Sequence, residues 1–140
     1  IQRQLKPEAR KDVIKVLDEL NIIPTSMIDI SDGLSTEIHH LSSSSNISIH
    51  IYEDKIPISD ETKNVCNEFN INPTVAALNG GEDYELLFTI SEKNSRKIID
   101  NPLFTILGSC NKKKNDNCMI TSIGQKINIS SKGWDPFNKK

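Results

Sequence analysis

The residues that this sequence lacks exclude several kinds of site. Its 140 residues include 3 cysteines, an odd number without a close pair, so we expect no disulfide framework and a reducing, cytoplasmic setting. The net charge of −2 provides no basic surface, so we expect neither nucleic acid nor a membrane as a partner. No apolar run approaches the length that spans a bilayer.

Common catalytic motifs are missing as well. The sequence has no Walker-type glycine-lysine loop, no dinucleotide fingerprint and no serine-nucleophile elbow. His39 and His40 are adjacent on a predicted helix, so they face different directions and do not form a ligand pair. Cys110 and Cys118 have no histidine or third cysteine near them in sequence, and we interpret them as strand residues that flank a loop.

The residues that are present form tight apolar runs separated by very polar segments. Hydrophobic residues make up 36% of the chain, and 140 residues correspond to one domain with its own core. Strands and helices are interleaved irregularly, and the chain ends in consecutive strands. This order predicts an α+β sandwich with a mixed, largely antiparallel sheet.

The spacing of the apolar residues places the individual elements. It predicts an amphipathic helix over 7–20 and strong strands at 26–30 and 84–90. Further helices are predicted at 32–41, 60–70, 73–79 and 92–99, and further strands at 47–58, 104–110, 118–123 and 126–130. The serine run at 42–46 predicts a loop, and the polar segment 111–117 predicts the tip of a hairpin.

The stretch SMIDISDGLS, residues 26–35, places two aspartates and a serine where an apolar strand ends and a helix begins. Asp29 should point outward at the end of the strand. One interpretation is that Ser31 caps the helix and Asp32 favours the positive end of its dipole. The other is that both carboxylates form an oxygen-rich site for Mg²⁺, with a phosphate at the helix N-terminus. Only the second gives Asp29 a role.

The stretch LNGGEDYELLFTI, residues 78–90, is a second candidate. Gly80 and Gly81 permit positive φ and a close approach of a ligand to the backbone. Glu82 and Asp83 follow at the mouth of the strongest strand. The alternative is a helix C-cap followed by a tight turn, with two solvated acids.

A third candidate is SKGWDPF, residues 131–137, which contains the only tryptophan, Trp134. A tryptophan in such a tail can pack on the domain as a lid. An indole beside an acid can equally stack on a planar or cationic ring.

Together, MIDISDGLS, GGEDYELLFT and GWDPF resemble the thiamine-monophosphate kinase family, and specifically the C-terminal half of its members. The stretch RQLKPEAR, residues 3–10, is similar to the connection from the N-terminal half. The resemblance implies that 1–6 is an interdomain linker tail and that 7–140 is the C-terminal domain. Because the chain opens on Ile1 rather than methionine, we expect it to be part of a longer protein.

The resemblance also implies a fold, an activity and a set of site residues. The fold is that of aminoimidazole ribonucleotide synthetase, an α+β sandwich that is partly ferredoxin-like. The activity is ATP-dependent phosphorylation of thiamine monophosphate to thiamine diphosphate, with Mg²⁺ as cofactor and no protein nucleophile or base. The implied site residues are Asp29 and Asp32 as metal ligands, Ser31 as an ATP contact, Glu82 and Trp134 as substrate contacts, and Gly80, Gly81 and Asp83 as the supporting loop.

In this family the N-terminal domain supplies most of the metal-binding acids and the main dimer interface. The resemblance therefore implies that the full-length protein is a homodimer and that the isolated chain is inactive. Two other functions stay open. One is another superfamily member, such as an aminoimidazole ribonucleotide or selenophosphate synthetase, against which the glycine-acid-tyrosine stretch speaks. The other is a module that binds a thiamine-like ligand without catalysis.

Overall fold

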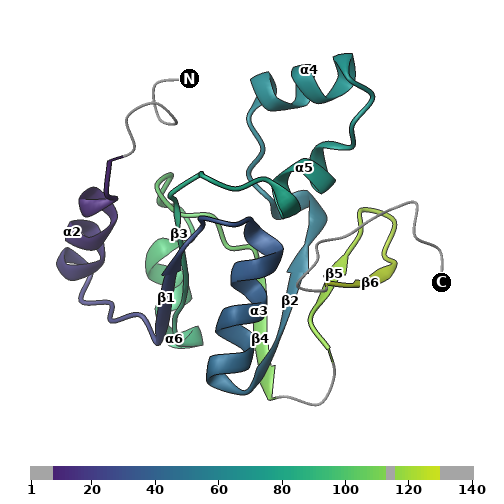
Figure 1. The fold of residues 1–140 in the computed structure, drawn as a ribbon. Helices are drawn as coiled ribbons and strands as arrows, with labels where there is room; N and C mark the ends of the chain where they lie inside the picture. The colour runs from purple at the N-terminus through teal and green to yellow at the C-terminus, as the bar shows by residue number, and fades with distance from the viewer. Residues whose placement is uncertain (1–7, 113–115, 130–140) are drawn as a thin grey trace.

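The computed structural model describes residues 8–112 and 116–129, which form an α+β fold with two sheets (Figure 1). The first sheet consists of two antiparallel strands, β1 (Ser26–Asp29) and β3 (Leu86–Thr89). The second sheet has the order β4-β2-β5-β6, with β2 and β5 parallel and the other pairs antiparallel. The predicted mixed, largely antiparallel α+β architecture is confirmed. In chain order the elements are α2 (Lys11–Glu19), β1 (Ser26–Asp29), α3 (Leu34–Ser45), β2 (Ile47–Tyr52), the 3-10 turn η1 (Glu53–Lys55), α4 (Asp60–Glu68), α5 (Pro73–Asn79), β3 (Leu86–Thr89), α6 (Glu92–Ile98), β4 (Gly108–Lys112), β5 (Cys118–Ile120) and β6 (Lys126–Asn128).

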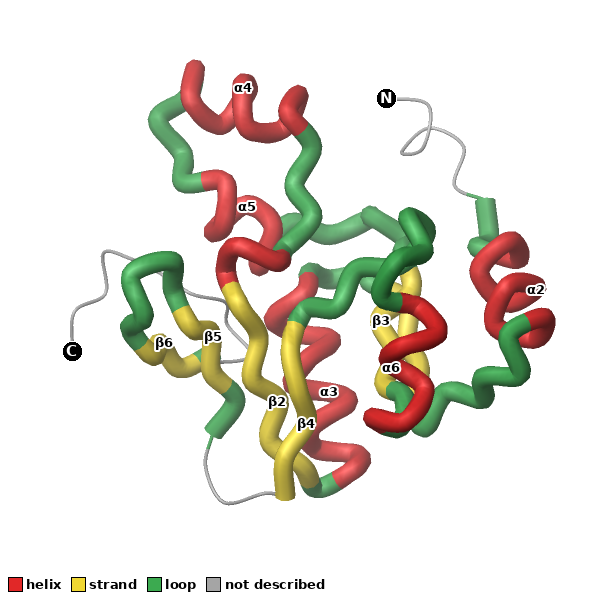
Figure 2. Tube along the Cα trace, turned by 180° about the vertical axis from the view of Figure 1, so that it is seen from behind, coloured by secondary structure: helices red, strands yellow, loops and turns green. Residues whose placement is uncertain are grey.

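The two-stranded sheet β1–β3 lies between two apolar clusters. Successive side chains of a strand point to opposite faces, so each strand serves both clusters. Met27, Leu86 and Phe88 pack against the α2 cluster, whereas Ile28 and Leu87 pack against the α3 cluster. Seen from behind, α2 lies outside this sheet and α3 lies between it and β2 (Figure 2). The α2 cluster consists of Val13, Leu17, Ile22 and Ile98, and the α3 cluster of Leu34, Ile38, Leu41, Ile49, Ile51, Ile56, Leu78, Met119 and Ile129.

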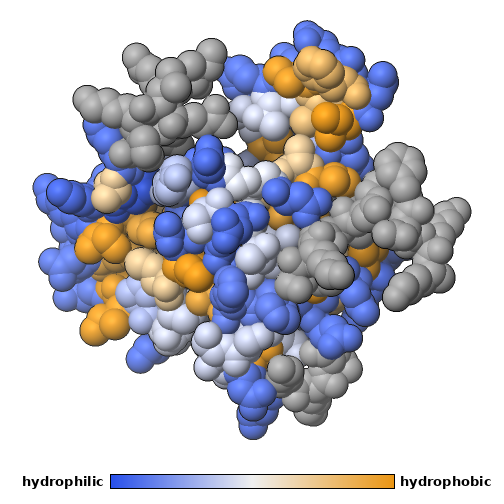
Figure 3. Space-filling view, in the orientation of Figure 1, coloured by the Kyte–Doolittle hydropathy of each residue, from blue (hydrophilic) through white to orange (hydrophobic). Residues whose placement is uncertain are grey.

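Helix α4 stands apart from both clusters. The hydroxyl oxygen of Ser59 accepts a hydrogen bond from the Thr62 backbone N–H (3.2 Å) and so caps the helix. Of its own residues only Cys66 is buried. Val65 and Phe69 are exposed, and Figure 3 shows apolar residues gathered over this helix at upper right. Helix α4 therefore adds little to the core.

The serine run does not form the predicted loop, so that prediction was wrong. Helix α3 continues to Ser45 and ends at Asn46, which adopts a left-handed φ of 49°. Ser42 is buried, and its hydroxyl donates to the Ile47 carbonyl (2.6 Å). Tertiary packing of the last turns outweighs the weak helix propensity of serine, and an asparagine in the left-handed region ends the helix.

The predicted hairpin tip at 111–117 was also wrong. Strands β4 and β5 lie on opposite sides of β2, so the segment between them crosses β2 and does not join neighbouring strands. Its last residue, Asn117, is buried, and its side-chain oxygen accepts a hydrogen bond from the Ile49 N–H (2.9 Å). The sequence did not reveal that Asn117 is buried, because its burial depends on a distant strand.

In residues 8–112 and 116–129, no helix combines the length and the apolar character that crossing a bilayer requires.

The α3 cluster should dominate the stability of the domain. Ile38 is 0% exposed, so Ile38→Ala should lower the free energy of unfolding by about 2–5 kcal/mol. Ile123 is 77% exposed, and Ile123→Ala should change it by less than about 0.5 kcal/mol. Thermal melts followed by circular dichroism measure both. Equal effects of the two substitutions would contradict this assignment of the core.

Candidate functional site

The two acidic stretches, 80 to 85 and 29 to 32, form one structural unit. Beyond the last β1–β3 pair, Ile30 N donates to the Glu85 carbonyl (2.8 Å) and Tyr84 N donates to the Ile30 carbonyl (3.0 Å). Glu82 N then donates to the Ser31 carbonyl (2.8 Å). The antiparallel pairing therefore continues past the sheet and brings both loops to the same end of it.

Glycines let these two loops pack backbone against backbone. A Cβ on Gly81 would lie 2.3 Å from the Ser31 carbonyl oxygen, closer than any side-chain atom can come. Gly33 has a φ of +110°, and a Cβ there would lie 2.9 Å from the Leu78 carbonyl oxygen. Gly81 thus permits a close approach of two chain segments.

The positive φ angles that the glycine pair permits occur instead on two residues that follow it. Gly80 has a φ of −73°, whereas Glu82 and Tyr84 have φ of 64° and 52°. A non-glycine residue in the left-handed region costs about 1–2 kcal/mol, so its surroundings must hold it there. The hydrogen bonds from their N–H groups to Ser31 and Ile30 do so. The loop that presents Glu82 is therefore fixed by its partner loop.

The capping interpretation of Ser31 was wrong. Helix α3 begins at Leu34 with Gly33 as its N-cap, and no side chain caps it. The Ser31 hydroxyl instead donates to Glu37 Oε1 (3.4 Å), which also accepts from the Asp32 N–H (3.3 Å). Asp29 and Asp32 are both exposed on this loop. Their carboxylates stay free to bind a ligand at the surface.

Sequence reasoning missed Glu37, which is only 2% exposed. It lies three residues after Leu34 and four before Leu41, both of which are buried. This spacing places an acid on the apolar face of the helix and was the available signal.

An ion pair links the end of the second loop to the segment before α2. Arg10 forms an ion pair with Glu85 and another with Asp12 (3.0 Å), and so connects the start of α2 to the start of β3. The Arg10 guanidinium lowers the pKa of Asp12 by hydrogen bonding to it. Asp83 is exposed on this loop, but neighbouring protein atoms partly desolvate its carboxyl and raise its pKa.

The donor set suits a hard cation but is incomplete within the described part of the chain. Asp29, Asp32 and Ser31 offer carboxylate and hydroxyl oxygens, the ligands that Mg²⁺ prefers. In residues 8–112 and 116–129, no group of three or more histidine, cysteine, aspartate or glutamate side chains could hold a metal ion.

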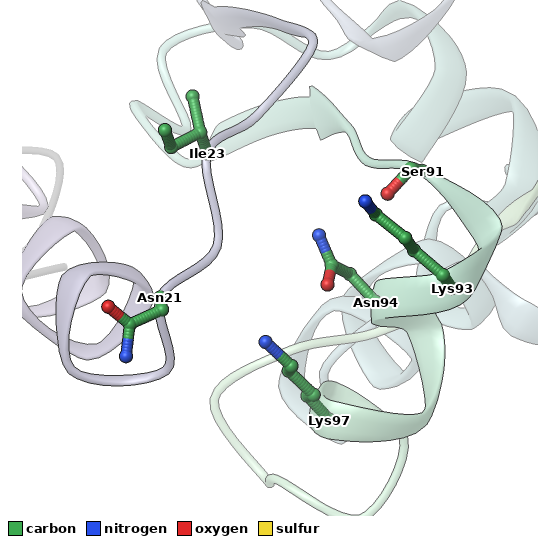
Figure 4. Close-up of a pocket in the computed structure, with 6 residues that line it drawn as sticks. All are labelled: Asn21, Ile23, Ser91, Lys93, Asn94 and Lys97. Carbon is green, nitrogen blue, oxygen red and sulfur yellow. The ribbon is translucent and has the colours of Figure 1, made fainter.

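An open pocket of about 640 Å³ lies at the other end of the β1–β3 sheet (Figure 4). It is formed where the chain enters β1 and leaves β3, beyond the Ser26–Thr89 pair. Lys97 Nζ donates to the Leu20 carbonyl there (3.0 Å). Among the described residues, those that line it include two lysines and no carboxylate. Its lining residues are Asn21, Ile23, Ser91, Lys93, Asn94 and Lys97.

The sequence matches curated proteins that are named thiamine-monophosphate kinase. It is 34% identical over 139 residues to "Thiamine-monophosphate kinase" of Pyrococcus abyssi, an alignment that covers 96% of this chain and 42% of the relative. The protein of that name from Escherichia coli K12 is 33% identical over 146 residues, covering 98% and 42%. The curated relatives of this chain are thus thiamine-monophosphate kinases. The chain matches the C-terminal part of these relatives and spans 42% of their length.

Solved structures agree with this assignment. "AaThiL complexed with AMPPCP and TMP" is 35% identical with a TM-score of 0.71, covering 97% of this chain and 40% of that chain. A hydrogenase maturation protein HypE, at 17% identity and a TM-score of 0.69, shares the fold alone. The predicted aminoimidazole ribonucleotide synthetase-like fold is thus confirmed. A search of protein-family models returned no match.

Trp134 lies outside the described residues. Its role as a substrate contact, alongside Glu82, therefore stays a prediction.

The contact between the two loops predicts the effect of a methyl group at Gly81. Gly81→Ala should push Ser31 and Glu82 apart and lower the free energy of unfolding by about 1–3 kcal/mol. Ser44→Ala, at an exposed position of α3, is the control and should change it by less than about 0.5 kcal/mol. Chemical denaturation measures both. A Gly81→Ala protein as stable as the control would contradict the packing of the loops.

The raised pKa of Asp83 predicts a pH dependence. A carboxyl whose pKa is higher in the folded state stabilises the fold below its unfolded pKa, and this contribution is lost as pH rises through the folded pKa. The side-chain amide introduced by Asp83→Asn is neutral at every pH. The Tm of Asp83→Asn relative to wild type should therefore rise between about pH 3 and about pH 7, the range in which carboxyls titrate. A constant Tm difference over that range would contradict the shift.

Proposed function

We propose that this chain is the C-terminal domain, residues 7–140, of a thiamine-monophosphate kinase, with 1–6 as the linker from an N-terminal domain. The full-length protein would phosphorylate thiamine monophosphate to thiamine diphosphate with ATP. Relatives of that name align with 96% and 98% of this chain, which supports the proposal. The observation that supports it most is the backbone hydrogen bond from Glu82 N to the Ser31 carbonyl, which joins the two predicted ligand loops at one end of the sheet.

The proposed roles rest on the resemblance to the kinase family, and the chemistry of each residue type suits its role. Asp29 and Asp32 hold Mg²⁺, and Ser31 contacts ATP. Glu82, presented by its strained loop, contacts thiamine monophosphate together with Trp134. Mg²⁺ supplies charge that offsets the developing negative charge on the phosphates. The acceptor is itself a phosphate oxygen, so the chain needs to provide neither nucleophile nor base.

Two carboxylates are too few for phosphoryl transfer, which depends on positioning and on neutralising several charges at once. We propose that an N-terminal domain contributes the remaining acids across a seam at this end of the sheet. The full-length protein would then act as a homodimer in the cytoplasm.

The isolated 140-residue chain should melt cooperatively but should not consume ATP when thiamine monophosphate and Mg²⁺ are supplied. The reason is that only part of the charge-neutralising site is present. Circular dichroism and a coupled ATP assay measure the two properties. Robust turnover by the chain alone would contradict the two-domain proposal, and a melt without cooperativity would contradict an independent core.

In the full-length protein, Asp29→Asn should lower kcat about tenfold or more and raise the Mg²⁺ concentration needed for half-maximal rate. Asp100→Asn, an exposed aspartate after α6, is the matched control and should leave both unchanged. Steady-state kinetics at varied Mg²⁺ test this. Unchanged kinetics for Asp29→Asn would contradict its role, and ligand binding by the full-length protein without any turnover would support the non-catalytic module instead.

A further inference from the structure

Helix α3 holds both loops of the site through two buried polar side chains near its start. Ser35 and Glu37 are 1% and 2% exposed. The Ser35 hydroxyl donates to the Leu78 carbonyl (2.8 Å), two residues before the glycine pair. Glu37 Oε1 accepts from the Ser31 hydroxyl (3.4 Å) and from the Asp32 N–H (3.3 Å). One helix therefore fixes where each loop leaves the core.

A glutamate at this buried position costs folding free energy. Its neighbours on the same helical face, Leu34, Ile38 and Leu41, belong to the α3 cluster. Burial of a carboxylate among apolar groups is unfavourable unless hydrogen bonds compensate for the lost water. Among the described residues no lysine, arginine or histidine forms an ion pair with it. The donors that compensate come from the Asp-Ile-Ser-Asp loop, so the loop and the buried charge depend on each other.

We propose that Glu37 is the positioning residue of the cation-binding loop. Its carboxylate holds the Ser31 hydroxyl and the Asp32 backbone in the arrangement that leaves the carboxylates of Asp29 and Asp32 available to one divalent cation. What the loop binds rests on the proposed function. Glu37 acts through the loop and is not itself a ligand, because it is buried beneath it.

This arrangement also determines whether the Ser31 hydroxyl can donate to a ligand or accept from it. A hydroxyl group has one proton, and the Ser31 proton is directed at Glu37 Oε1. Only the lone pairs of Ser31 Oγ remain for a ligand. In this arrangement Ser31 offers an acceptor to a cation, to the water bound to it, or to an N–H or O–H of the nucleotide.

Hydrogen exchange on the 140-residue chain tests the contact itself. In Glu37→Ala the Asp32 N–H loses its acceptor, so its exchange should accelerate about tenfold or more, while amides in β2 keep their protection. Ser35→Ala is the matched control. It removes the other buried hydrogen bond, from Ser35 to the Leu78 carbonyl, and should leave the exchange rate of the Asp32 N–H unchanged. Unchanged exchange at Asp32 in Glu37→Ala would overturn the proposal. If that variant does not melt cooperatively, Glu37→Gln is used, and its weaker neutral acceptor should still accelerate exchange at Asp32.

A Mg²⁺ titration followed by ¹H–¹⁵N NMR tests the consequence. In the wild-type chain, amides 29–33 should shift on addition of Mg²⁺, and Glu37→Gln should raise the apparent Kd about tenfold or more, the effect typical of residues that orient metal ligands. Glu92→Gln, an exposed acid on α6, should leave the Kd unchanged. Equal affinity in wild type and Glu37→Gln would overturn the positioning role alone. Absence of shifts in the wild type would instead overturn the proposed cation site, and with it any positioning role toward a cation.

Discussion

The antiparallel pairing of β1 with β3, and its continuation into the loops beyond them, is the constraint on which the site depends. Three backbone hydrogen bonds, to the carbonyls of Ile30, Ser31 and Glu85, join segments about fifty residues apart in sequence. Each bond fixes the backbone of a residue that lies beyond the ends of β1 and β3. The left-handed conformations of Glu82 and Tyr84 persist only because these bonds and the contact at Gly81 hold them. The same constraint makes the loops sensitive to the packing of the sheet between its two apolar clusters.

Much of this arrangement could be predicted from local sequence. The period-2 pattern of Leu86, Phe88 and their neighbours identified β3, and the apolar face of Leu34, Ile38 and Leu41 identified α3. The two acidic stretches were recognised because small and acidic residues cluster where apolar strands begin or end. These signals lie within a few residues of one another, and they survive folding because they reflect which side of an element is buried.

The remaining features depend on partners that are distant in the sequence. The serines of α3 are helical because the helix packs against β1 and β2, and Asn117 is buried because Ile49 offers it a donor. Ser31 resembles a helix cap, but Gly33 takes the N-cap position and Glu37 accepts its proton. Positive φ was expected at glycine and occurs at Glu82 and Tyr84 because tertiary hydrogen bonds offset the strain. Apart from the spacing that places Glu37 on the apolar face of α3, no local pattern carries this information.

The central claim is that the loops of residues 29–33 and 80–85 form one ligand site. Titration of the ¹⁵N-labelled chain with AMPPCP in the presence of Mg²⁺ tests it most directly. The account predicts that amides of both loops shift together along one saturation curve, while those around Lys93 and Lys97 stay in place. Shifts confined to one loop, or centred on the lysine-lined pocket at the other end of the sheet, would contradict it.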